Sequence, residues 1–361
     1  MAPTPGPDFK PLVHEVARLA GDVFQVWPQL DERLRPALGY DASTFCTIDP
    51  PTLLWTSRSV IGLDSGPERE SNALGFEFRA DDINNLPNLL MQQMPIGSLF
   101  SASGGNISRA LRYDSLLREL DLSDELRAVV RSEGLNWGVL TLYRKRPAEP
   151  FTYKELRAVR DALEPLGQLL RLRMLRSAAE DPGTLDHPPG LLAVSAEGAV
   201  TETSPAAAAR LATVDDPSAV PAAVAQVVAA FNAGDALAHV TLPSGEEVSV
   251  TLHASVGADG TLAVVVEEDR IVGLDQHVVD DYKFTDDEVE ILLFYATDRP
   301  TRTMAQILAI DAFTIQEWLM SMLAKTGTHN RRDFLAAIFA SHNEDKFKAG
   351  ARPSPYGFFL D

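Results

Sequence analysis

Cys46 and seven histidines are the residues of this sequence best suited to bind a metal or to act as nucleophiles. A single cysteine can form neither an intramolecular disulfide nor a thiolate-rich zinc site. Cys46 lies in an apolar, β-rich stretch with nothing basic beside it, so a small core residue is expected rather than a redox sensor. The histidines are scattered without ligand spacing, so neither a metal nor a cofactor is predicted. They are His14, His187, His239, His253, His277, His329 and His342.

No constellation of residues in the sequence supports catalysis. Neither an acid–base pair, a nucleophile elbow, a Walker loop nor a receiver-type acidic cluster with its lysine can be assembled. The segment SASGGN (101–106) lacks the lysine of a phosphate loop and the spacing of a dinucleotide fingerprint. A plain surface turn is expected there, and a mobile lid over a pocket is the functional alternative. We therefore expect a protein that is not an enzyme.

Length and charge restrict the class of protein further. A chain of 361 residues, of which 45% are hydrophobic and 23% charged, is long enough for two or three domains. The formal net charge of −19 opposes nonspecific adsorption to nucleic acid or anionic membrane, so any contact with nucleic acid must be local. The first residues do not resemble a signal peptide and no run approaches a membrane span, so a soluble, cytoplasmic protein is expected.

The first half of the sequence predicts a helix, a β-rich sheet and a long exit helix. The segment 41–60 alternates around Pro50-Pro51, which predicts a hairpin bend, and LNWGVLTLYRKR (135–146) predicts a half-buried central strand. The segment 153–178 repeats apolar residues at three- and four-residue spacing, which predicts one long helix. Proline and glycine then gather in 178–190, which is typical of a linker.

A second sheet is predicted after this linker. GLLAVSAEGAVTETSPAAAARL, which begins at Gly190, predicts a strand, a turn at Glu197-Gly198, a second strand, and a helix that begins near Ser204-Pro205. Three further strands are predicted in 237–269, separated by turns at Ser244-Gly245 and Asp259-Gly260. The result is an antiparallel sheet with helices on one face.

Both regions resemble known sensor domains. Residues 10–176 resemble a GAF-type domain through WGVLTLYR and the exit helix, and residues 190–268 resemble a small PAS fold through GLLAVSAEGAVTETSPAAA. Small-molecule sites are concave and largely aromatic or apolar, so five residues of the GAF-like region are candidate pocket walls, although most of them will be core. The five are Trp55, Phe76, Phe78, Phe100 and Trp137. An enzymatic α+β fold is the alternative interpretation.

The stretch TMAQILAIDAFTIQEWLMSMLAKTG (303–327) predicts two short helices around a bend, and residues 284–339 resemble the four-helix DNA-binding domain of LuxR-type transcription regulators. FTDDEVEILLFYATD matches the first helix of that family, with Thr285 as its cap, Glu288 at its third position and Val289, Leu292 and Leu293 as its buried stripe. The second helix spans about 301–308, and the recognition helix opens at Asp311 or Ala312. RRDFLAAIFA (331–340) resembles the last helix, which mediates dimerisation in the family.

The departures from the family pattern remove positive charge. Gln316 and Trp318 stand where the family usually has a base-reading lysine and a phosphate-contacting histidine, and Asp287 stands where an arginine is common. Residues 282–340 carry eight acidic against six basic side chains, a net charge of −2, whereas DNA-binding domains are usually basic. The candidate DNA contacts are Arg302, Thr314, Gln316, Trp318, Lys325, Arg331 and Arg332.

Two interpretations of this C-terminal region remain open. In the first, a dimer places the recognition helix in the major groove, Thr314 and Arg302 hold phosphates, and Gln316 reads a base edge. In the second, the fold is kept but direct DNA binding is lost, and Trp318 and Phe313 face a protein partner or the other domains.

The resemblances together imply a multidomain α+β protein: GAF-like and PAS-like antiparallel-sheet sensor domains, at 10–176 and 190–268, followed by an all-α four-helix LuxR-type helix-turn-helix domain at 280–345. The expected function is that of a bacterial transcriptional regulator that binds double-stranded DNA and is controlled by a small-molecule effector or a protein partner. A homodimer is expected, and its interface is expected to involve the helices at 154–176 and 332–340. The alternative is a degenerate helix-turn-helix protein that acts through protein–protein interaction.

Overall fold

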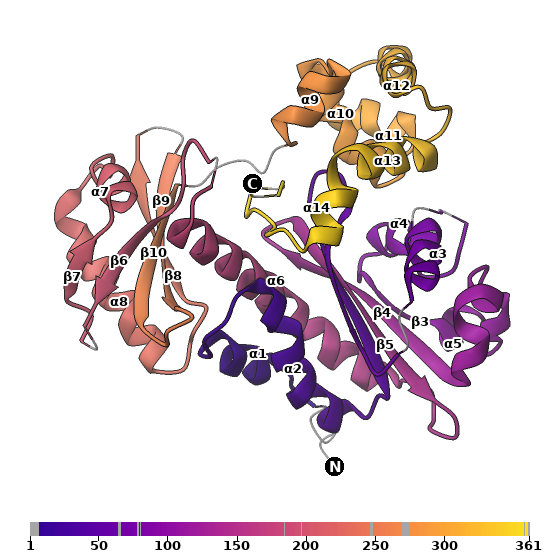
Figure 1. Ribbon diagram of the computed structural model, residues 1–361, viewed down its shortest axis with the longest axis horizontal. Helices are drawn as coiled ribbons and strands as arrows, with labels where there is room; N and C mark the ends of the chain where they lie inside the picture. Colours follow the sequence, from indigo (N-terminus) through magenta and orange to yellow (C-terminus); the bar gives the residue numbers. More distant parts are fainter. Residues whose placement is uncertain are drawn as a thin grey trace. The chain divides into compact units, whose positions relative to one another are not determined.

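The computed structural model of the chain describes residues 7–63, 66–77, 79, 81–183, 185–195, 197–245, 248–268, 274–356 and 358–359. The chain divides into two compact units, each built around a five-stranded antiparallel sheet (Figure 1). Unit 1 consists of Met1–Pro7, Leu38–Arg160 and Gly273–Ala351, and unit 2 of Asp8–Ala37, Asp161–Val272 and Arg352–Asp361. The mixed α+β class is thus confirmed, whereas the predicted domain boundaries remain predictions.

The sheet of unit 1 has the strand order β2-β1-β5-β4-β3. Its strands are β1 (Ala42–Ile48), β2 (Trp55–Ile61), β3 (Ile96–Ser98), β4 (Leu122–Ser132) and β5 (Leu135–Lys145). β1 and β2 are antiparallel and joined across Pro50-Pro51, and β5 lies between β1 and β4, so both predictions for this region are confirmed. Glu133 and Gly134 connect β4 to β5 with φ values of 52° and 78°, the left-handed conformation that a two-residue hairpin turn requires.

Short helices and turns connect the edges of this sheet. They are α3 (Pro67–Glu77), α4 (Leu86–Leu90), α5 (Leu99–Ala102) and the single-turn segments Ile107–Arg109, Tyr113–Leu117 and Arg118–Leu120. The predicted turn in 101–106 begins in α5 and continues through Gly104 and Gly105, both with positive φ.

Unit 2 contains the second sheet, in the order β7-β6-β10-β9-β8. Its strands are β6 (Gly190–Val194), β7 (Val200–Thr203), β8 (His239–Ser244), β9 (Val248–Val256) and β10 (Leu262–Glu268). α7 (Pro205–Leu211) and α8 (Val220–Asn232) pack against it, and the side chain of Ser204 caps α7 by accepting a hydrogen bond from the N–H of Ala207 (Figure 1). The strands and this helix start are where the sequence predicts them.

Three further helices complete the N-terminal half of the chain: α1 (Lys10–Ala17), α2 (Val23–Leu38) and α6 (Tyr153–Glu180). α6 corresponds to the exit helix predicted at 153–178 and is two residues longer at its C-terminal end. Arg173 of α6 is only 2% exposed and donates to the backbone carbonyls of Val16, Gly21 and Val256, at 2.7 to 3.1 Å. Burial lowers the pKa of this guanidinium to about 10.

The C-terminal part of unit 1 is helical. It comprises α9 (Gln276–Tyr282), α10 (Asp286–Ala296), α11 (Thr301–Leu308), α12 (Ala312–Thr326), α13 (Arg331–Ile338), a π-helical turn at Phe339–Asn343 and α14 (Glu344–Ala349). The predicted capping box is confirmed, because the N–H of Thr285 donates to Glu288 at 2.8 Å and the N–H of Glu288 donates to the Thr285 hydroxyl at 3.3 Å.

The chain turns by 115° between α11 and α12. Ala309 ends α11 at a φ of 55°, and Asp311 caps α12 by accepting from the N–H groups of Phe313 and Thr314. Of the predicted buried stripe of α10, Leu292 is buried and Val289 is half-buried, while the side chain of Leu293 lies outside the described residues. The fully buried residues of this region include Ile291, Ile315, Met322, Phe334 and Ile338.

Within the described residues, no single helix is both long enough and apolar enough to cross a membrane. The bent pair α11–α12 meets that criterion jointly, by length and composition alone.

The contact between β6 and α7 is tight enough to predict the effect of one methyl group. A Cβ placed on Gly190 would lie 2.2 Å from the backbone nitrogen of Ala207, and neither backbone can move without shifting β6 or α7. We expect Gly190→Ala to lower the free energy of unfolding by roughly 3 kcal/mol. Gly66→Ala is the control, because its Cβ meets nothing within 4 Å. Equal denaturant midpoints for the two variants would show that the contact is not tight.

Asp49, in the bend between β1 and β2, predicts how the stability of the fold depends on pH. Its side chain is buried and accepts hydrogen bonds from Thr52, and burial raises its pKa to about 8. Because the folded state holds this proton more tightly than the unfolded state, the contribution of Asp49 is fully present below about pH 4 and is lost as pH rises to about 8. The free energy of unfolding of the unsubstituted protein should therefore fall by up to about 1.4 kcal/mol per pH unit in that window. We expect Asp49→Asn to abolish this fall. Parallel stability–pH curves for the two proteins would contradict this.

Candidate functional site

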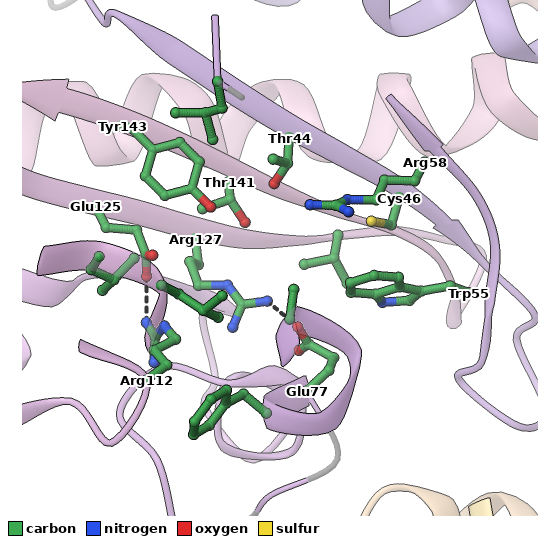
Figure 2. A pocket seen from close by; sticks show the side chains of 16 residues that line it. Thr44, Cys46, Trp55, Arg58, Glu77, Arg112, Glu125, Arg127, Thr141 and Tyr143 are labelled. Carbon is green, nitrogen blue, oxygen red and sulfur yellow. Dashed lines mark hydrogen bonds and ion pairs between the residues drawn. The ribbon is translucent and has the colours of Figure 1, made fainter. Parts of the chain in front are cut away.

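One face of the first sheet forms the floor of a cavity, and strand register determines which side chains meet there. Arg127 of β4 is paired with Thr141 of β5, which is paired with Thr44 of β1. Glu125 lies two residues before Arg127 and is paired with Tyr143. Because side chains two residues apart on a strand point to the same face, Glu125 and Arg127 share this floor (Figure 2).

The other walls come from α3, the turn at Tyr113–Leu117 and the β1–β2 edge. Ala73, Phe76 and Glu77 of α3 line the cavity, as do Leu116 and Leu117. Cys46, Trp55 and Arg58 lie together at one end (Figure 2), and Val139 also lines the cavity. The cavity has a volume of about 50 Å³, which is room for about three to five water-sized groups.

Buried ion pairs hold these walls together. Arg112 donates to Asp82 at 2.6 Å, to the carbonyl of Ile83 at 2.7 Å and to Glu125. Burial alone would lower the pKa of Arg112, but the carboxylates of Glu125 and Asp82 outweigh it and raise that pKa. Arg112 therefore remains charged and joins the loop before α4 to β4.

A second pair joins α3 to β4. Arg127 donates to Glu77 at 2.5 Å, and the other oxygen of Glu77 accepts from the N–H of Leu86 at 2.9 Å. Arg127 is 6% exposed and Glu77 is 4% exposed, so neither charge is solvated by bulk water. Tyr143, beside them, is half-buried, and the burial of its phenol raises its pKa to about 12 and keeps the phenol neutral.

The predicted pocket walls are only partly brought together. Trp55 and Phe76 line the cavity. Trp137 is fully buried elsewhere in the core, with its indole N–H 3.4 Å from the carbonyl of Ser132, and Phe100 is 38% exposed and does not line the cavity. Phe78 lies outside the described residues. Cys46, predicted as a core residue, is buried in β1 and also lines the cavity.

The charged lining residues are the part of the site that sequence reasoning missed. A signal was present in LSDELRAVV (122–130), where Glu125 and Arg127 occupy alternating positions of an otherwise apolar strand. Two charges on one face of a buried strand require partners, but Glu77 and Arg112 lie too far away in the sequence to be identified as those partners.

The candidate DNA contacts of the C-terminal helices fall into two groups. Arg302, Gln316 and Arg332 are exposed, and Thr314 is half-buried with its hydroxyl donating to Asp311. The remaining three make contacts inside the domain. Lys325 donates to Glu288 at 2.5 Å and to the carbonyl of Lys283 at 2.7 Å, Arg331 is buried with its Nε 3.4 Å from Asp298, and Trp318 is half-buried against the apolar cluster that includes Ile315.

The outward face of α12 is more apolar than a DNA-reading helix usually is. Phe313 is 71% exposed and Met320 is 64% exposed, and Gln316 and Glu317 are exposed between them. Ile307 of α11 is 56% exposed. Of these five side chains, only Glu317 is charged, and its charge is negative.

Clusters of three or more metal-binding side chains are absent from the part of the chain that the structure describes. No protein-family model and no curated protein matches the sequence. Among solved structures, the chain is similar to a chain of the DhaR(N)–DhaL complex of E. coli, over 73% of its own length and 90% of that chain. The identity is 12% and the TM-score is 0.22, which is too low to show a common fold.

The Arg112 ion pairs predict a large and specific loss of stability. In Arg112→Met, Asp82 and Glu125 would remain buried without their cation, so the free energy of unfolding should fall by about 3–5 kcal/mol at pH 7. The loss should shrink as pH falls, because protonation neutralises the stranded carboxylates. Arg118→Met removes an exposed pair with Asp114 and should cost less than about 1 kcal/mol. Denaturation at pH 5 and pH 7 checks both variants, and a loss that does not depend on pH would exclude stranded carboxylates as its cause.

Proposed function

We propose that this chain is a signal-responsive transcriptional regulator of the bacterial type, in which the C-terminal helix-turn-helix region binds double-stranded DNA. One observation carries the proposal: α11 and α12 are joined by a short turn that changes the chain direction by 115°, and α12 begins with a side-chain cap and exposes one face. This arrangement allows the second helix to enter a major groove while the first crosses the backbone.

The two antiparallel sheets support a sensory role for the rest of the chain. Counted within each unit, both have the strand order 2-1-5-4-3, which fits the resemblance to GAF-type and PAS-type domains. The cavity over the first sheet is a place for a small effector. An effector with different affinities for two states of the chain would shift the population that binds DNA.

DNA binding by this region would depend on few charges. Arg302 and Arg332 are exposed, whereas Lys325 and Arg331 already bind acidic groups of their own domain. Each neutralised phosphate steepens the salt dependence, so this regulator should show a shallow one. Two copies bound to two half-sites would compensate for weak single sites, which is why we propose a homodimer.

A second candidate output is direct contact with a protein. Ile307, Phe313 and Met320 expose large apolar side chains on α11 and α12, and exposed apolar groups of this kind mark interaction surfaces more often than DNA contacts. In that case the helix-turn-helix is a scaffold for the partner.

A selection of bound DNA fragments with the intact chain at low salt tests the first candidate. If α12 reads DNA, a sequence should be enriched, and Gln316→Ala should relax the preference at one base position by roughly 1–3 kcal/mol. Met320→Lys should raise affinity for all fragments and increase the salt slope by about one. Val200→Lys adds the same charge at a 43% exposed site in unit 2 and should do neither.

Failure to enrich any sequence, with equal effects of the two added lysines, would reject DNA binding by α12. The protein-contact candidate then predicts that Phe313→Ala and Met320→Ala weaken association with the partner while leaving the fold intact, because both side chains are exposed.

A further inference from the structure

We infer that the cavity over the first sheet binds a small zwitterion of the α-amino acid class, with the ligand carboxylate on Arg127 and the ligand ammonium on Glu125. This inference rests on the sensory role in the proposed function and specifies its effector.

Arg127 provides the anion-binding group. Its guanidinium carries five N–H donors in one plane, and its hydrogen bond to Glu77 is the one that it makes within the described part of the chain. Figure 2 shows the guanidinium between Glu77 and the β5 side chains, with a further nitrogen directed into the cavity. Because the group is 6% exposed, its remaining donors can be satisfied only by what enters the cavity. A carboxylate matches that fork in geometry and in charge.

Glu125 provides the cation-binding group. It is 1% exposed and one of its oxygens accepts from Arg112, while the second has no hydrogen-bond partner among the described residues. Glu125 and Arg127 lie about 7 Å apart along β4 and face the same cavity. Their side chains can therefore converge on two groups of one small molecule.

Charge balance favours a zwitterion over a simple anion. Of the buried arginines that line the cavity, Arg112 is paired with Asp82 and Glu125, and Arg127 is paired with Glu77. Each of these buried arginines therefore already has a carboxylate that compensates its charge. A ligand with a net charge would leave one buried charge uncompensated, whereas a neutral molecule with both charges would not.

The remaining walls limit the ligand's side chain. Trp55, Phe76, Leu117 and Val139 present an apolar surface, and the volume of about 50 Å³ restricts the occupant to the smallest members of the class. A short aliphatic side chain fits this surface, and a second charge does not.

Calorimetric titration and thermal shift with the full chain test this inference. The probes are glycine, alanine and valine, with propionate as the carboxylate alone and alaninamide as the ammonium alone. At least one amino acid should bind and raise the melting temperature, and each single-charge analogue should bind at least tenfold more weakly. Equal binding of propionate would overturn the zwitterion, and no response to any amino acid would overturn the site.

Variants locate the binding. Arg127→Gln should weaken binding at least tenfold, while Arg118→Gln, an exposed arginine in the same unit, should leave it unchanged. Ala73→Leu fills the cavity from α3 without touching an ion pair and should abolish binding in a folded chain, so the test does not depend on the stability of the Arg127 variant. Unchanged affinity in Ala73→Leu would place the ligand elsewhere.

The DNA selection is independent of these titrations. A chain that enriches a DNA sequence but binds no amino acid would overturn this inference alone. A chain that binds an amino acid but no DNA would overturn the proposed DNA output alone.

Discussion

Buried arginine–carboxylate pairing is the constraint on which the first sheet and its cavity depend. Arg112 binds Asp82, Ile83 and Glu125 at once, so it joins the segment before α4, the turn at Tyr113–Leu117 and β4. Glu77 binds Arg127 and the N–H of Leu86, and so fixes the end of α3 to the start of α4 and to the sheet. In the described residues between β2 and β4, the helices are short, and their own hydrogen bonds are too few to hold them in place.

The same principle operates separately in unit 2. Arg171 of α6 makes two hydrogen bonds to Glu267 of β10, at 2.7 and 2.9 Å, and Glu267 also lies 2.7 Å from the ring nitrogen of His253 on β9. Burial would raise the pKa of Glu267, but the neighbouring His253 and Arg171 lower it, so the carboxylate stays charged. A buried ion pair of this kind adds less stability than an apolar contact of the same size. The Arg171–Glu267 pair instead fixes the position of α6 along β10.

The sequence predicted elements whose signals are local. Hydrophobic alternation located β1, β2, β5 and the strands of the second sheet, and the capping residues Thr285 and Ser204 marked helix starts within one residue.

The charged residues of the cavity were not predicted because they come from segments far apart in the sequence. Glu77 and Arg127 are 50 residues apart, and Arg112 and Glu125 are 13 apart. Of the five aromatic residues predicted as its walls, Trp55 and Phe76 line it, and Tyr143, an aromatic residue that was not predicted, lines it as well. Aromatic side chains are used in cores and in pockets alike, so their presence alone does not separate the two.

Basic residues of the C-terminal region show in the same way that residue type alone does not identify a binding role. Lys325 and Arg331 have the residue types of phosphate contacts, but Lys325 binds the carboxylate that closes the capping box of α10, and Arg331 is buried beside Asp298. To bind a phosphate, each side chain would first have to give up its acidic partner, and burial already lowers the pKa of Arg331.

The exposed side chains of α12 therefore determine whether this region binds DNA or a protein. Phe313 and Met320 there offer apolar surface, while Gln316 is the exposed amide of that face and can pair with an adenine edge. A helix with this surface can recognise DNA only where one base contact and the shape of the groove suffice, because it contributes almost nothing to the electrostatic attraction on which most such helices rely.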